Sequence, residues 1–273
     1  MSKEIFVINL KGEKEPFSLK KVYQSARNVG ASKELAREIA QQIQQEVYPD
    51  ITTKQIFNRI YEMFLERSLV SAIKFNLKRA IEKLGPTGFP FEKFIGKIFN
   101  AEGFAVKLNQ FIPGFCRIRY EIDFLAQKEK LVLIGECKYH QFPGERVDLQ
   151  VALANAARFF DIKKGRFANS HNLYKSILVT NTKFTPQAIA YSQCMGIQLL
   201  GWKYPFQQGL EKLIERNKLY PITILPAVSS QLAKNLIDQG IVLVQDVLGK
   251  EFAKLSIAKK QRIIKEAEIL LKE

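Results

Sequence analysis

The chain has 273 residues, of which 47% are hydrophobic and 25% charged, enough to build one to three globular domains with buried cores. Its formal net charge of +15 suits a polyanionic partner such as DNA or RNA, although a generally basic protein gives the same total. The three cysteines, Cys116, Cys137 and Cys194, have no metal-ligand spacing, so neither a disulfide framework nor a structural zinc site is expected. A signal pattern and an apolar run of about 18 residues are both missing, which favours a cytoplasmic protein without a membrane partner.

The first 85 residues are predicted to form a separate unit, a β-hairpin followed by four helices. Residues 5–10 have the composition of a strand, residues 11–13 that of a turn, and residues 15–17 begin the return strand. Helices are expected where a Ser or Thr cap precedes apolar residues at helical spacing. They are predicted at residues 18–30, at residues 32–48, from the capping box of Thr52 and Gln55 onward, and at residues 69–83, before Gly85-Pro86 ends the unit.

A hairpin followed by about four helices resembles the ATP-cone, a regulatory nucleotide-binding domain best known at the front of ribonucleotide reductases. The resemblance covers nearly all of residues 3–84. Lys21 matches the family's lysine in the first helix, and Thr53 matches its threonine near the start of the third. The resemblance implies that these residues bind ATP or dATP as an effector.

The hairpin departs from the ATP-cone pattern at the two positions where that family typically carries Lys-Arg. Those positions are Asn9 and Leu10 here, so two cations that would meet phosphates are absent. Lys11 and Lys20 lie near the same hairpin and can substitute electrostatically, because lysine acts on phosphate as a point charge. The domain is therefore expected either to bind nucleotide or to have lost it and to serve in docking or homo-oligomer assembly.

The most informative stretch is an apolar run from Leu131 that reads as a buried strand. It ends in Glu136 and Lys138, which share one face because successive strand side chains alternate. Residues 121–125 form a second strand-like segment, and the short polar turn between the two folds it back as a hairpin. The hairpin is predicted to bring Asp123 beside Glu136 and Lys138.

Asp123, twelve intervening residues and then Glu136-Cys137-Lys138 resemble the D…(D/E)xK site of the PD-(D/E)XK nucleases. Flanking segments narrow the resemblance to the Mrr-like restriction endonucleases and extend it over roughly residues 86–203. They are a helix opening at residues 88–94, a strand at residues 177–181, a helix starting at residues 184–188 and a last core strand at residues 196–200. Ile122 takes the place of a proline, which is a common variation. The resemblance implies an αβββαβ core and a DNA endonuclease.

The same residues suit phosphodiester hydrolysis on chemical grounds. Asp123 and Glu136 offer the oxygen ligands that Mg²⁺ or Mn²⁺ prefers, and a bound ion lowers the pKa of its water and acts as a Lewis acid. The Cys137 side chain points to the opposite face, so only its backbone carbonyl can join the ligands. Lys138 would orient the attacking water or stabilise the phosphorus centre. The alternative is an ordinary buried salt bridge of Lys138 with Asp123 or Glu136.

Further candidates flank this site. Gln150 lies in the first turn of a helix predicted at residues 147–160, where related nucleases place a residue near the metal, but a plain solvated helix position is the favoured interpretation. Glu92 lies where many relatives place an extra acid, and the helix dipole also favours a first-turn glutamate. A basic loop, which is either a phosphate contact or a solvated charge run, contains Lys163, Lys164 and Arg166.

These patterns predict an α/β protein with an ATP-cone-like domain (1–85), a restriction-endonuclease-like core (86–205) and a small helical C-terminal region (206–273). In the last region Gly240 loosely resembles the hairpin glycine of a helix-hairpin-helix unit, whose backbone N–H groups face a phosphate. The predicted function is metal-dependent cleavage of DNA, regulated by ATP or dATP. The alternative is a catalytically silent nucleic-acid-binding protein with a nucleotide-sensing or oligomerisation cone. The patterns do not distinguish DNA from RNA or define the specificity of cleavage.

Overall fold

The computed structural model describes residues 4–85, 88–142, 144–168, 171–249 and 255–272. They divide into two compact units. The first runs to Arg79 and includes the end of the chain from Glu268, and the second comprises Ala80–Ala267. The helix stop expected at Pro86 lies outside the described residues.

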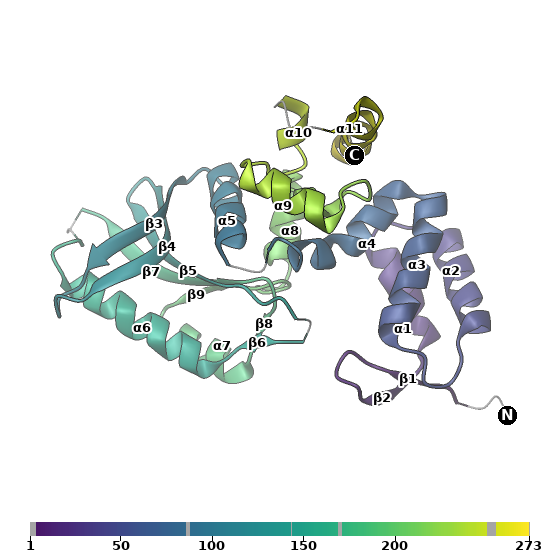
Figure 1. Ribbon diagram of the computed structural model, residues 1–273. Coiled ribbons are helices and arrows are strands. Elements are labelled where there is room, and N and C mark those ends of the chain that lie inside the picture. Colours follow the sequence, from purple (N-terminus) through teal and green to yellow (C-terminus); the bar gives the residue numbers. More distant parts are fainter. Residues whose placement is uncertain (1–3, 86–87, 143, 169–170, 250–254, 273) are drawn as a thin grey trace. The chain divides into compact units, whose positions relative to one another are not determined.

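The first unit is a two-stranded antiparallel hairpin followed by helices, as the sequence predicts (Figure 1). The side chains of Ser18, Ser32 and Thr52 each accept a backbone N–H from the helix that they precede. Thr52 also forms the expected capping box with Gln55. The strands are β1 (Phe6–Ile8) and β2 (Lys14–Pro16), and the helices are α1 (Leu19–Asn28), α2 (Lys33–Glu46), α3 (Thr53–Arg67) and α4 (Leu69–Ile81).

The turn between β1 and β2 is shaped by Asn9 and Gly12. The Asn9 side-chain oxygen accepts the backbone N–H of Lys11 at 2.8 Å and that of Glu13 at 3.1 Å. Gly12 has a φ of 81°, a conformation that glycine adopts without steric cost. Asn9, which stands where the ATP-cone carries a cation, therefore uses its side chain to close the turn.

A five-stranded mixed sheet lies at the centre of the second unit (Figure 1). Its strand order is β3-β4-β5-β7-β9, with the first two neighbouring pairs antiparallel and the last two parallel. Apart from the two-residue strand β6, the chain order from α5 to β7 is the predicted αβββαβ. The elements are α5 (Phe89–Ala101), β3 (Ala105–Pro113), β4 (Arg119–Lys128), β5 (Leu131–Lys138), α6 (Leu149–Lys164), β7 (Leu173–Thr180), α7 (Pro186–Cys194) and β9 (Gln198–Leu200), with a small second sheet of β6 (Arg146–Val147) and β8 (Lys183–Phe184).

Helix α5 covers one face of the five-stranded sheet, and α6 and α7 cover the opposite face (Figure 1). On the α6 side, Val132 and Ile134 of β5 pack in one cluster with Phe159. On the α5 side, the rings of Phe99 and Phe124 have their centroids 5.0 Å apart. Because β5 is covered on both faces, its sequence reads as a continuous apolar run instead of an alternating one.

Strand β4 separates from β5 at the middle of β4 and near the carboxyl end of β5. Their paired positions end at Phe124 and Gly135. In the β3–β4 ladder the pair Asn109–Asp123 is skipped, and Asn109 has a φ of 52°, in the left-handed region. Beyond this bend the β3–β4 hairpin packs against α6 through Ile112 and Ile122.

Helices follow the sheet to the end of the described chain, and a turn at residues 239–245 joins α9 to α10. Gly240 in this turn has a φ of 79°. The backbone N–H groups of Val242 and Leu243 each donate to Oδ2 of Asp246 at 3.0 Å, so both amides are engaged within the chain. The elements are α8 (Leu210–Asn217), the 3₁₀ turn η1 (Ile222–Ile224), α9 (Ser230–Asp238), α10 (Asp246–Gly249) and α11 (Ile257–Lys272).

Candidate active site

Asp123 meets the end of β5 where β4 and β5 separate. The backbone N–H of Cys137 donates to Oδ2 of Asp123 at 2.7 Å, so the carboxylate satisfies an amide that has lost its strand partner. On its other side β5 stays paired with β7 as far as Lys138 and Thr180. The Thr180 hydroxyl donates to the carbonyl of Lys138 at 2.7 Å. The end of β5 is therefore held from both sides, which gives its side chains a rigid base.

Glu136 is only 8% exposed and lies between two cations. The Nζ of Lys138 is 3.3 Å from its Oε1, and Nη1 of Arg158 on α6 donates to its Oε2. Arg158 also donates to the backbone carbonyl of Glu121 at 3.5 Å. The buried carboxylate is therefore compensated, as burial of a charge requires. The Lys138 side chain remains 43% exposed, so its ammonium can also contact a ligand from solvent.

Glu92 on α5 belongs to the same group of charges. Burial raises the pKa of Glu92 to about 7, and the negative charges of Asp123, Glu121 and Glu136 add to the shift. Near neutral pH this carboxyl is therefore protonated for part of the time. Carboxyls with such strongly raised pKa values gather at functional sites more often than elsewhere.

Asp123 is perturbed in the same direction. Burial raises the pKa of Asp123 to about 6, and the charge of Glu136 adds to the effect. The Cys137 N–H and the charges of Arg158 and Lys138 oppose the shift without cancelling it. Burial and the charge of Glu136 together thus outweigh the Cys137 N–H and the two nearby cations in setting the pKa of Asp123.

A divalent cation reduces the electrostatic repulsion among neighbouring carboxylates. The charges of Glu121, Asp123 and Glu136 all act on Glu92, and Lys138 and Arg158 are the cations that contact Glu136. Within the described residues, no three His, Cys, Asp or Glu side chains converge closely enough to hold a metal by themselves. Mg²⁺, however, is commonly held by one or two carboxylates together with water and substrate phosphates. Burial holds the pKa of the Cys137 thiol well above its usual range, so that residue can contribute only its carbonyl. The donor set fits Mg²⁺ or Mn²⁺ on these terms.

The other candidates on α6 and beyond it lie apart from these carboxylates. Gln150 is exposed in the first turn of α6, about 12 Å along the helix from Arg158, the residue that contacts Glu136. The structure thus gathers Glu92 with the three motif residues and leaves Gln150 at the surface. The basic side chains at the end of α6 are also exposed: Lys163, Lys164 and Arg166.

Two residues of the site, Arg158 and Glu121, were not singled out from the sequence as site residues. Arg158 occupies a position between the buried Asn155 and Phe159 on the inward side of α6. An arginine inside such an apolar stripe is a usable signal, because an arginine is rarely buried without a partner. Glu121 precedes Asp123 by two positions on β4, so strand alternation alone predicts that it shares that residue's face.

The candidate nucleotide-binding residues lie on three elements of the first unit. Lys21, in the first turn of α1, has its Nζ 3.6 Å from Oε1 of Glu15 on β2. Lys11 in the hairpin turn and Lys20 on α1 are exposed, and Thr53, the first residue of α3, is half-buried.

No helix among the described residues combines the length and the apolar character needed to span a membrane.

The fold and the site define a mixed α/β protein with a carboxylate-rich site where two strands of its sheet separate. Residues 220–271 match the family model described as AF1548-like, C-terminal. An uncharacterised protein of Archaeoglobus fulgidus is 35% identical over 179 residues, which is 64% of this chain and 98% of that relative. The chain belongs to the AF1548-like family.

Among solved structures, AF1548, a protein of unknown function, is 31% identical and matches with a TM-score of 0.55 over 68% of this chain and 100% of that one. VC1899 from Vibrio cholerae is 14% identical with a TM-score of 0.32, over 73% of this chain and 55% of its own. The MspJI restriction endonuclease in complex with a 27-mer oligonucleotide is 11% identical with a TM-score of 0.30, over 89% of this chain and 52% of its own. The last two scores are too low to carry an argument.

Proposed function

We propose that this protein is a metal-dependent endonuclease that hydrolyses phosphodiester bonds of DNA and is related to the Mrr-like PD-(D/E)XK nucleases. The observation that carries the proposal is the convergence of Asp123, Glu136 and Lys138 where β4 separates from β5. The net charge of +7 over residues 86–205, with 16 Lys and Arg against 9 Asp and Glu, supports a polyanionic substrate.

Each residue has a role that follows from its environment. Asp123, Glu136 and the Cys137 carbonyl would hold Mg²⁺ or Mn²⁺, which when bound lowers the pKa of water and neutralises phosphoryl charge. Lys138, with its exposed ammonium, orients the attacking water and stabilises negative charge at phosphorus. Arg158, whose guanidinium forms paired hydrogen bonds with phosphate as well as with carboxylate, positions the scissile phosphate. Glu92, with a pKa near 7, is suited to accept the proton of the water.

A cleavage assay tests this proposal. Supercoiled, linear, methylated, branched and single-stranded DNA, with RNA as a further substrate, are incubated with Mg²⁺ or Mn²⁺. We expect cleavage of DNA that stops in excess chelator and in the variants Asp123→Asn and Glu136→Gln. Glu129→Gln, in the exposed turn after β4, is the matched control and should cleave normally. Full activity in chelator would contradict the two-carboxylate mechanism.

A second candidate function is nucleic-acid binding without cleavage, and the ion pairs of Glu136 favour it. Both carboxylate oxygens of Glu136 already contact a cation, Lys138 or Arg158, as in an ordinary structural network. The two functions separate in a thermal-denaturation titration with Mg²⁺ and Mn²⁺. A nuclease should be stabilised by the metal, since a ligand that binds only the folded state raises Tm, and Asp123→Asn should remove the effect. A silent protein should show no shift.

For the first unit, the proposal is that it binds ATP or dATP and thereby regulates cleavage. The hairpin-plus-helices arrangement and the cations Lys11, Lys20 and Lys21 beside the hairpin support it. Loss of nucleotide binding, with assembly of a homo-oligomer as the remaining role, is the alternative.

A further inference from the structure

The hairpin that connects β3 to β4 exposes large apolar side chains close to the candidate site. Phe111 is 53% exposed, Phe115 66% and Ile118 53%, all within eight consecutive positions. Apolar groups of this size are normally buried, and a cluster of them at one tip of a structured hairpin marks a contact surface.

The tip is held rigidly in place by the end of α6. The backbone N–H of Phe115 donates to the carbonyl of Asp161 at 2.9 Å, and that of Cys116 donates to its Oδ1 at 3.0 Å. Gly114 is required here, because a Cβ on it would lie 1.9 Å from Oδ2 of Asp161. The exposure of Phe115 and Ile118 is therefore a property of a fixed tip and not of a loose loop.

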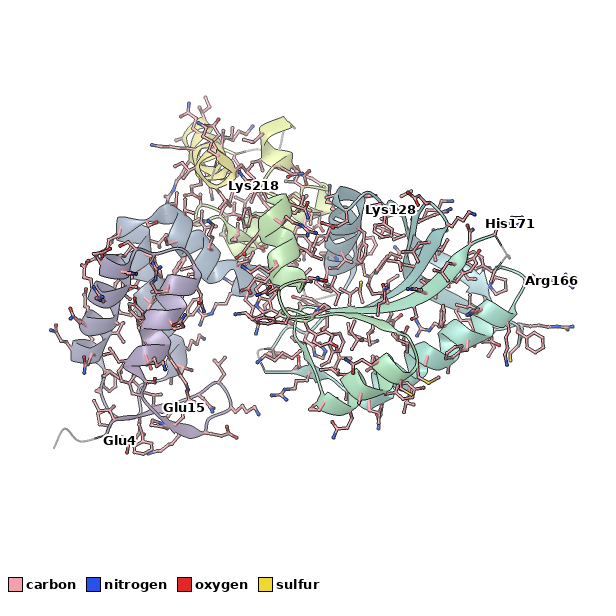
Figure 2. The ribbon with its side chains drawn as sticks, turned by 180° about the vertical axis from the view of Figure 1, so that it is seen from behind. Glu4, Glu15, Lys128, Arg166, His171 and Lys218 are labelled. Carbon is pink, nitrogen blue, oxygen red and sulfur yellow. The ribbon has the colours of Figure 1, made fainter. Side chains whose placement is uncertain are left out.

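The tip also carries positive charge. Arg117 and Arg119 are exposed on the hairpin, and the Arg119 guanidinium lies 5.0 Å from the centroid of the Phe111 ring. The carboxylate of Asp161 is already engaged by the tip. Arg166 lies just beyond the end of α6 (Figure 2). Lys163 and Lys164 are exposed at the end of α6, the helix that holds the tip, and the charge of Lys164 reaches Cys116. Exposed aromatic rings and cations on one region are the combination that binds single-stranded nucleic acid through its bases and backbone.

One strand face connects the tip to the candidate site. Phe111 pairs with Glu121 across the β3–β4 ladder, and Arg119, Glu121 and Asp123 alternate along the same face of β4. Arg119 and Asp123 are four residues apart, about 13 Å along a strand and comparable to the rise of about four stacked nucleotides. A nucleic-acid strand with one phosphate at Asp123 can thus have its neighbouring bases against Phe111 and Phe115.

We propose that this hairpin tip stacks unpaired bases on Phe111 and Phe115, so that the substrate is DNA with a single-stranded segment beside the scissile phosphate. The inference rests on the proposed nuclease function and specifies its substrate. Bases inside a duplex cannot offer a face to these rings, whereas unpaired bases can, and Arg117 and Arg119 then meet the phosphates on either side.

The test is a binding measurement on the full chain in excess chelator, which prevents cleavage. Fluorescence anisotropy compares a single-stranded oligonucleotide, a blunt duplex and a duplex with a single-stranded overhang. Because stacking of one base is worth about 1–3 kcal/mol, we expect Phe115→Ala to weaken single-strand and overhang binding by about 5- to 150-fold and duplex binding much less. Phe206→Ala, which removes a ring that is 84% exposed elsewhere, is the matched control and should bind as wild type does.

Two further variants separate stacking from mere apolar contact. Phe115→Tyr keeps the ring and should retain affinity, whereas Phe115→Leu keeps an apolar side chain and should lose it. Wild-type affinity in Phe115→Leu, or an equal loss of affinity for the blunt duplex in Phe115→Ala, would each overturn the inference. If the wild type cleaves DNA and Phe115→Ala binds and cleaves as the wild type does, the nuclease proposal stands and the stacking inference is wrong. A wild-type chain that binds no nucleic acid would remove both.

Discussion

Lys138 contacts the buried Glu136 while a large part of its own side chain stays in solvent, so its structural and chemical roles can be separated. Arg158 also compensates Glu136, and the fold should therefore tolerate loss of the lysine. We expect Lys138→Ala to lower the cleavage rate by about 10²–10⁴, the range of a lost acid–base contribution, with unchanged thermal denaturation. Single-turnover cleavage and denaturation are measured on the same preparation.

Lys130→Ala, in the exposed turn before β5, serves as the control for loss of one positive charge. Cleavage by Lys138→Ala at the wild-type rate would reduce Lys138 to a salt-bridge partner. Unfolding of the variant would instead support the structural salt bridge over the catalytic role.

The titration of Glu92 makes the stability of the folded chain depend on pH. Its pKa rises from 4.5 to about 7 on folding, so between these values the folded chain binds more protons than the unfolded chain. Its contribution to stability is therefore full below about pH 4 and is lost as pH rises through 7. Glu92→Gln removes the titration. The Tm of this variant should therefore increase relative to the Tm of the wild type as pH is raised from 5 to 8.

The expected gain is modest because the Glu92 side chain is only about half-buried and solvent screens its interactions. About 1 kcal/mol, or about 2–4 °C in Tm, is the scale for a unit of this size. Denaturation followed in the presence of chelator measures it. A difference in Tm between variant and wild type that stays constant with pH would contradict the argument.

At the level of elements, the β4–β5 hairpin could be predicted almost completely from the sequence. The apolar run from Leu131, the polar turn before it and strand alternation together place Asp123 beside Glu136. The bend that separates β4 from β5 at these carboxylates could not be predicted. It depends on a left-handed backbone conformation at Asn109, and most asparagines do not adopt that conformation. The contact of Arg158 with Glu136 was also missed, since it depends on how α6 packs against the sheet.

Gly135 links this hairpin to its packing against α5. A Cβ at Gly135 would lie 2.2 Å from the ring of its cross-strand partner Phe124, which is fully buried. We expect Gly135→Ala to destabilise the second unit by about 1–3 kcal/mol, the usual cost of overpacking. Gly249→Ala, where an added Cβ meets nothing within 4 Å, is the control. In the double variant with Phe124→Leu the two losses should be less than additive, because removal of the ring relieves the clash. Additive losses in denaturant unfolding would argue against this contact.

For the molecule as a whole, regulation requires that nucleotide bound to the first unit change the behaviour of the second, which is a coupling free energy between two sites. Lys21 and Thr53 could be named as nucleotide contacts only through resemblance, and Lys11 and Lys20 only as cations near the same hairpin, because a phosphate site made of lysines has no sequence pattern of its own. The structure adds two facts that bear on affinity. Asn9 uses its side chain to close the hairpin turn, and Lys21 lies 3.6 Å from Glu15.

Both facts weaken the expected binding of ATP or dATP. Each charge-assisted hydrogen bond is worth about 1.5–3 kcal/mol, and Asn9 and Leu10 supply no such bond to a phosphate. A triphosphate must also draw Lys21 away from Glu15. We therefore expect binding that is micromolar or weaker, is abolished by Lys21→Ala and is unchanged by Lys33→Ala, an exposed lysine at the start of α2. Calorimetry of the full chain with each nucleotide measures it, and cleavage rate and oligomeric state are followed alongside. The absence of heat at millimolar nucleotide would leave this unit as an assembly module, and the nuclease proposal would stand unchanged because its residues all lie in the second unit.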